Sequence, residues 1–174
     1  MPASGLARPP RRRKHEALHS TRVSWHVNAP RTAVYRAVLD ADAVAAWRVP
    51  DGMTSRVHAF DAREGGTFRV SLTYRDGTDA EGKSGAHTDT YHGHFARLVP
   101  DEQVVEVLEF ETPAPVFRGS MTVTTTLADA YGGTDVVVTH GGLPDAVPAA
   151  DNETGTRMAL AKPAAPVEAG ERPS

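Results

Sequence analysis

Apolar and polar residues alternate along much of the chain, and alternation with a period of two is typical of β-strands that bury one face. The pattern first occurs at residues 21–27, where Val23, Trp25 and Val27 share a face. It returns after residue 53 and predicts six further strands, at residues 54–61, 67–74, 90–99, 103–111, 118–127 and 135–140. Most of these segments are separated by short turns, so consecutive strands are expected to pair as antiparallel neighbours.

Helical spacing of apolar residues replaces this alternation in two short segments after the first strand. Residues 30–40 predict an amphipathic helix, with Asn28 as its expected cap. Residues 40–47 predict a second helix, capped by Asp40 or Asp42. The long run of strands begins only after these two helices.

A last helix is expected over residues 151–162, with Asp151 or Asn152 as its cap. Pro163 and Pro166 follow this range. An interior proline costs a helix roughly 3 kcal/mol, because it removes a backbone donor and clashes with the preceding turn. We therefore expect this helix to be kinked or shortened at the end of that range.

The order of these elements predicts an α+β helix-grip fold. A curved antiparallel sheet of about seven strands has one apolar face to cover, and the C-terminal helix is expected to lie across that concave face. The length of 174 residues suits one domain, expected over residues 21–168. Residues 1–20 hold five basic side chains against one acidic one and few large apolar groups, so they predict a disordered basic arm. Residues 169–174 are expected to be a disordered tail.

Charge and composition exclude several classes of site. The net charge is −3, and the excess of acidic residues after the basic arm gives no reason to expect nucleic-acid binding by the folded domain. The chain has no cysteine, which excludes disulfides, thiol catalysis and thiolate metal sites. No apolar run approaches the ~18 residues of a membrane span, and no secretory signal is recognisable, so a cytoplasmic protein is expected. We expect no cofactor.

Four short motifs narrow the fold to a family. They read VNAPRTAVY at residues 27–35, DAD through AW at 40–47, FDAREGGTFR at 60–69 and HGGLP at 140–144. With these motifs in this order, the chain resembles the START-like or SRPBCC superfamily (Bet v 1-like, polyketide cyclase), in the branch related to the activator of Hsp90 ATPase. The match covers about residues 23–168. It departs in the last helix, where relatives carry a Gly-Trp pair and this chain has Gly155 followed by Thr156.

The resemblance implies a cavity between the sheet and the last helix that takes a small apolar or lipid-like molecule. Binding without catalysis is the first hypothesis. Some members are cyclases or hydrolases, so an enzyme acting on an aromatic or polyketide-like substrate is the second, and a co-chaperone-like interaction module is the third. The ligand's identity and the oligomeric state stay open, a dimer included.

The residues expected to line this pocket, or the core behind it, are large apolar side chains with inward strand parity or on the last helix. They are Trp47, Phe60, Phe68, Val70, Tyr74, Phe95, Leu108, Phe110, Met121, Val123, Met158 and Leu160.

Two sets of polar residues are candidates for chemistry. Glu106 shares strand parity with Val104 and Leu108, so one register puts it in the pocket as a general acid or base. The other register, with Val105 and Val107 inside, is equally compatible with the pattern. His92 and His94 lie two apart on a strand and therefore on one face, a spacing that suits two metal ligands. No third ligand is fixed by the sequence, so a solvated strand face is the favoured interpretation and no metal is expected.

Overall fold

The computed structural model describes residues 20–49, 51–75, 87–144 and 146–168. The predicted arm over residues 1–20, apart from Ser20, and the predicted tail over residues 169–174 lie outside the described residues. The side chains of Trp47 and of residues 162–168 are outside the description as well.

One antiparallel sheet of seven strands contains every strand of the described residues. Along the chain the elements are β1 (Thr21–Val27), α1 (Arg31–Val38), α2 (Ala41–Trp47), β2 (Met53–Phe60), β3 (Thr67–Tyr74), β4 (Thr88–Val99), β5 (Gln103–Phe110), the short 3₁₀ helix η1 (Pro115–Phe117), β6 (Met121–Ala130), β7 (Gly133–Gly141) and α3 (Ala149–Glu168).

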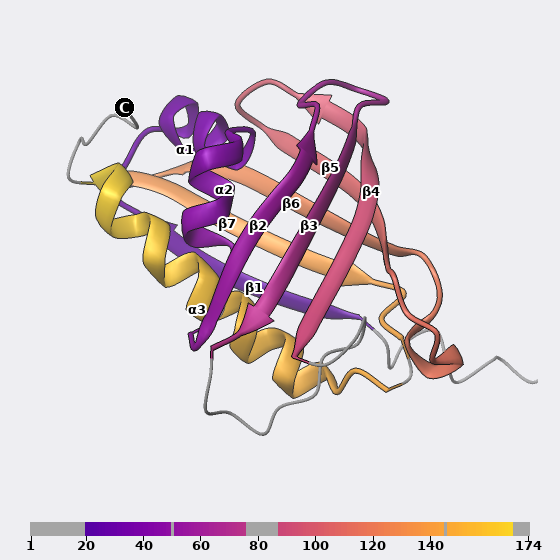
Figure 1. The fold of residues 1–174 in the computed structure, drawn as a ribbon. Helices are drawn as coiled ribbons and strands as arrows, with labels where there is room; N and C mark the ends of the chain where they lie inside the picture. Colours follow the sequence, from indigo (N-terminus) through magenta and orange to yellow (C-terminus); the bar gives the residue numbers. More distant parts are fainter. Residues whose placement is uncertain (1–19, 50, 76–86, 145, 169–174) are drawn as a thin grey trace, which may run out of the picture.

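The strand order is β1-β7-β6-β5-β4-β3-β2. Six strands follow each other as a meander, and β1 joins the far edge by pairing with β7. In Figure 1 the sheet curves around α3, which runs alongside β1, while α1 and α2 lie beside the C-terminal half of α3. The predicted α+β helix-grip fold is therefore confirmed.

The register of β5, which the sequence left open, follows from its burial. Val104, Glu106 and Leu108 are buried, whereas the alternate residues Val105 and Val107 are only partly buried. The first of the two registers is thus the one adopted. It turns a carboxylate, that of Glu106, toward the concave side of the sheet.

An aromatic cluster fills one end of the concave face. The ring of Phe95 is fully buried and contacts Phe60 and Phe68, with ring centroids 5.4 and 5.2 Å apart. Such contacts stabilise a core beyond the burial of area alone. This end of the concave face is therefore filled by packed side chains.

Two of the expected helix caps are wrong and one is confirmed. Pro30 occupies the N-cap of α1 and makes no side-chain cap bond, while the Asn28 amide oxygen contacts Nε2 of His26 at 3.0 Å. Asp40 caps α2, since its carboxylate accepts a hydrogen bond from the Ala43 backbone N–H at 2.8 Å. α3 begins at Ala149, so Asp151 and Asn152 lie inside its first turn rather than at the cap.

The expectation that the last helix is shortened is also wrong. α3 continues through Pro163 and Pro166 to Glu168. The neighbouring alanines are the strongest helix formers, which offsets part of the cost of the two prolines. The kink that the prolines predict stays a prediction.

Among the described residues, every helix is too short or too polar to span a membrane.

Candidate functional site

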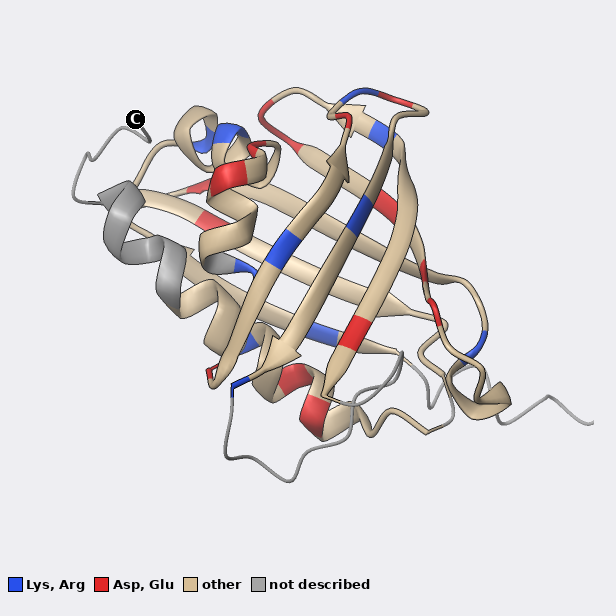
Figure 2. Ribbon diagram, in the orientation of Figure 1, with Lys and Arg blue, Asp and Glu red and all other residues tan. Residues whose placement is uncertain are grey.

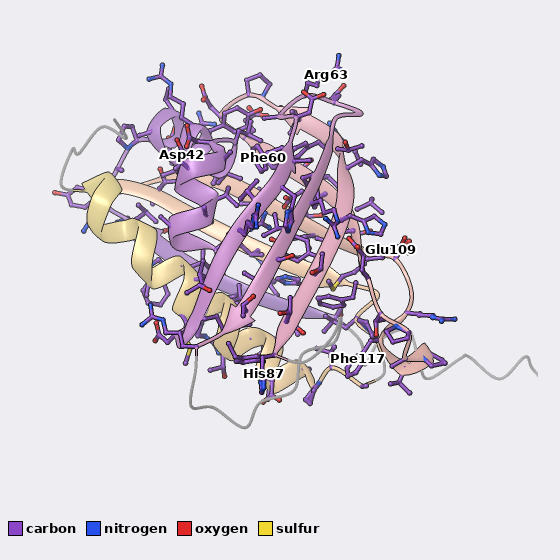
Figure 3. The ribbon with its side chains drawn as sticks, in the orientation of Figure 1. Asp42, Phe60, Arg63, His87, Glu109 and Phe117 are labelled. Carbon is purple, nitrogen blue, oxygen red and sulfur yellow. The ribbon has the colours of Figure 1, made fainter. Side chains whose placement is uncertain are left out.

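A cavity of about 530 Å³ lies between the concave face of the sheet and α3. Its wall is largely apolar and takes apolar residues from four strands and the helix: Leu72, Leu108, Phe110, Met121, Val123, Val138 and Leu160. The lining residues Asp51, Ala146 and Asp151 are exposed, so the cavity opens to solvent near the start of α3. Figure 3 shows Phe117, another lining residue, at this end of the sheet.

The sequence-predicted pocket residues divide into two groups in the structure. Six line the cavity: Tyr74, Leu108, Phe110, Met121, Val123 and Leu160. Phe60, Phe68, Val70 and Phe95 do not line it and lie in the core behind it, the same hydrophobic cluster to which Leu108, Met121, Val123 and Leu160 also belong. Met158 is 38% exposed. The side chain of Trp47 lies outside the description. The parity of each strand places a residue on the concave side, but its position along the strand decides between core and cavity.

A buried ion pair lies beside the cavity. The Arg48 guanidinium donates from Nη1 to Glu106 Oε1 at 2.7 Å and from Nη2 to Oε2 at 2.8 Å. The Glu106 side chain is 1% exposed and that of Arg48 19% exposed. Arg48 immediately follows α2 and lines the cavity, whereas Glu106 comes from β5. The two-point geometry is the strongest form of this interaction and fixes the orientation of both groups.

The guanidinium of Arg48 keeps its charge. Burial would lower the pKa of Arg48, but the charge and hydrogen bonds of Glu106 outweigh burial and raise the pKa above its ordinary value. Tyr91 on β4 lies nearby and lines the cavity. Burial raises the pKa of Tyr91, so its phenol keeps its proton at neutral pH.

His140 near the end of β7 is the other notable group in the wall. Burial and the positive charge of Arg48 lower the pKa of His140 to about 4, so the imidazole is neutral at physiological pH. Its Nδ1 atom is buried and has no hydrogen-bond partner among the described residues. A neutral imidazole provides one donor and one acceptor, which makes this ring a polar but uncharged position in an apolar wall.

Sequence reasoning missed Arg48 altogether and did not place His140 in the pocket. For His140 a signal exists, because it continues the inward parity of Val136 and Val138 on β7. For Arg48 there is none. It follows the last turn of a short helix, and its partner is 58 residues away in the sequence.

The two weak metal candidates, His92 and His94, are not part of a three-ligand group among the described residues. His92 Nε2 contacts Glu109 Oε1 at 2.9 Å, and His92 Nδ1 contacts Glu111 Oε2 at 3.3 Å. His94 is exposed, and Figure 3 shows Glu109 pointing away from α3. Within the described part of the chain, no group of three or more metal-ligating side chains is assembled.

The comparisons with known proteins agree with this fold. The family model described as Activator of Hsp90 ATPase homolog 1-like protein matches residues 28–165. Protein CV1439 from Chromobacterium violaceum is 31% identical, with a TM-score of 0.77, over 86% of this chain and 97% of that one.

Two more distant structures share the fold. The Aha1 dimer from Colwellia psychrerythraea is 16% identical, with a TM-score of 0.61, over 88% of this chain and 98% of that one. DynU16, from the dynemicin biosynthetic locus, is 22% identical, with a TM-score of 0.61, over 87% of this chain and 48% of that one. No match was found among curated proteins. The chain belongs to the family of Activator of Hsp90 ATPase homolog 1-like proteins, of the SRPBCC fold that its motifs indicate.

Proposed function

We propose that the chain binds a small, largely apolar molecule in the cavity between the sheet and α3, without catalysing a reaction on it. The observation that carries this proposal is the cavity itself. Its volume of about 530 Å³ is typical of small-molecule sites. So is its composition, since an apolar wall supplies affinity and a few fixed polar groups supply orientation.

The arrangement of Glu106 favours binding over acid–base catalysis. A general acid or base must lie within hydrogen-bond reach of the reacting group. Glu106 is almost fully buried, both of its oxygens accept from Arg48, and it is not among the described residues that line the cavity. Its place in the fold is that of a group that orients Arg48.

Gly155 offers a way to fill the cavity without removing any packing. It lies on α3 and lines the cavity, and a Cβ built on it has nothing within 4 Å. Gly155→Leu is therefore expected to weaken binding of the neutral dye N-phenyl-1-naphthylamine at least about ten-fold, a change of ~1.4 kcal/mol. The fold should persist, because removing a glycine from a helix interior stabilises the helix by up to about 1 kcal/mol. Dye fluorescence titration gives the affinity, and thermal melting checks the fold.

Thr154→Leu is the matched control, since it places the same side chain on the adjacent, exposed position of α3. It should leave dye affinity close to that of the parent chain. Equal affinities for both variants would mean that the dye binds elsewhere, and a parent chain that does not bind the dye at all would count against the proposed function.

A further inference from the structure

We infer that the molecule bound in this cavity is neutral and presents one oxygen, a hydroxyl or a carbonyl, to the side chain of His140. This inference rests on the proposed function and specifies the class of ligand. It follows from two features of the wall, the hydrogen-bonding capacity of His140 and the distribution of charge around it.

The hydrogen-bonding capacity of His140 is not used within the described residues. Its ring lines the cavity together with apolar side chains such as Val138 and Leu160, and its Nδ1 is buried without a partner among the described residues. Because Nδ1 has almost no accessible surface, the ring nitrogen that a molecule in the cavity can reach is Nε2. A ligand that brings a polar oxygen to Nε2 adds a hydrogen bond there, whereas a pure hydrocarbon does not.

The charges around the ring oppose both kinds of charged ligand. Arg48 is the lining cation, but Glu106 compensates its charge through a two-point hydrogen bond. A carboxylate ligand would therefore meet no net positive charge, and it would also face the lining carboxylates Asp51, Asp89 and Asp151. Figure 2 shows acidic residues, coloured red, on the first turns of α3, at the end where the cavity opens.

An ammonium group next to His140 is opposed mainly by burial. The surroundings that withdraw the His140 ring from water, and so disfavour its charged form, disfavour any cation there, and the ion-paired Arg48 adds a smaller effect of the same sign. A hydroxyl or carbonyl has neither difficulty, and each matches the donor or the acceptor of a neutral imidazole. The wall thus selects a polar, uncharged group.

The test uses four probes that share one ring system: naphthalene, 2-naphthol, 2-naphthoate and 2-(aminomethyl)naphthalene. Each competes with N-phenyl-1-naphthylamine for the full-length chain at neutral pH. We expect 2-naphthol to bind about three- to ten-fold more tightly than naphthalene, the gain of one net hydrogen bond. The naphthoate and the amine should bind more weakly than 2-naphthol.

The preference for 2-naphthol over naphthalene should depend on His140. His140→Leu is expected to abolish it while naphthalene still binds, and His140→Gln, which keeps a donor and an acceptor, should retain part of it. His94→Leu removes an exposed imidazole on the outer face and should leave the preference unchanged. Because the preference is a ratio measured within each variant, a general loss of folded protein does not mimic a selective effect.

The outcomes separate this inference from the proposed function. If no probe displaces the dye, both the proposed function and this inference are wrong. If naphthalene displaces it but 2-naphthol gains nothing, if a charged probe binds most tightly, or if the preference survives His140→Leu, the proposed function stands and the inference is wrong.

Discussion

Replacing Glu106 with alanine is expected to lower the free energy of unfolding by about 3–5 kcal/mol, the usual cost of leaving a buried charge without its partner. Arg48 would keep its charge but lose the two carboxylate oxygens of Glu106, which accept its hydrogen bonds at 2.7 and 2.8 Å. Arg48→Met should cost a comparable amount for the mirror reason, since it leaves the carboxylate of Glu106 buried. Urea denaturation at neutral pH measures both.

The double variant distinguishes a lost charge partner from lost packing. Arg48→Met combined with Glu106→Leu removes both charges and keeps much of the buried volume, so its cost should be far below the sum of the single changes. Glu109→Ala is the control on the same strand. Its side chain is 48% exposed, and its removal should change stability by at most about 1 kcal/mol. Additive costs in the double variant would contradict the argument.

The strands were predictable from the sequence because each has one wet and one dry face, and this alternation is a local property. On β3, for example, Phe68 and Val70 alternate with Thr67 and Arg69, and both apolar side chains are buried. The antiparallel order followed from the short connections, apart from the pairing of β1 with β7, which depends on closing the whole sheet. The alternation within each strand and the short connections were therefore sufficient to predict most of the fold.

The boundary between core and cavity was not predictable. Along β3 the inward residues Phe68 and Val70 belong to the core, whereas Leu72 and Tyr74, on the same face, line the cavity. Strand β5 changes in the same way between Val104 and Leu108. Whether an inward residue lies in the core or lines the cavity depends on which distant element packs over that part of the sheet. The alternation within one strand contains no information about this packing.

The register of β5 shows a related limit. Both parities of this strand hold two valine or leucine side chains, so hydrophobicity alone does not choose between them. The adopted register buries Glu106, which is tolerable because Arg48 arrives from α2 to compensate its charge. A long-range ion pair forms only in the assembled fold, so it cannot be predicted from a single sequence.

His140 is expected to make the chain's stability depend on pH, because its imidazole is held neutral in the fold. Its pKa is about 4 in the folded chain and 6.5 in the unfolded chain, so below pH 6.5 the unfolded state takes up a proton that the folded state does not. The contribution is complete above pH 6.5 and is lost as the pH falls to 4. At ~1.4 kcal/mol per pKa unit, the loss is about 3 kcal/mol.

The measurement is the difference in unfolding free energy between the parent chain and His140→Gln, followed from pH 7 to pH 4. This difference should shift against the parent chain by about 3 kcal/mol, because glutamine takes up no proton in either state. Other acid-sensitive groups cancel in the comparison. Glu111 is one of these groups, because its hydrogen bond to Arg69 lowers its pKa and its contribution to stability is lost in acid.

His94→Gln, on the exposed face, should follow the parent chain. Parallel pH profiles for the parent chain and His140→Gln would show that the cavity wall already admits a protonated imidazole, and would remove the charge argument for a neutral ligand.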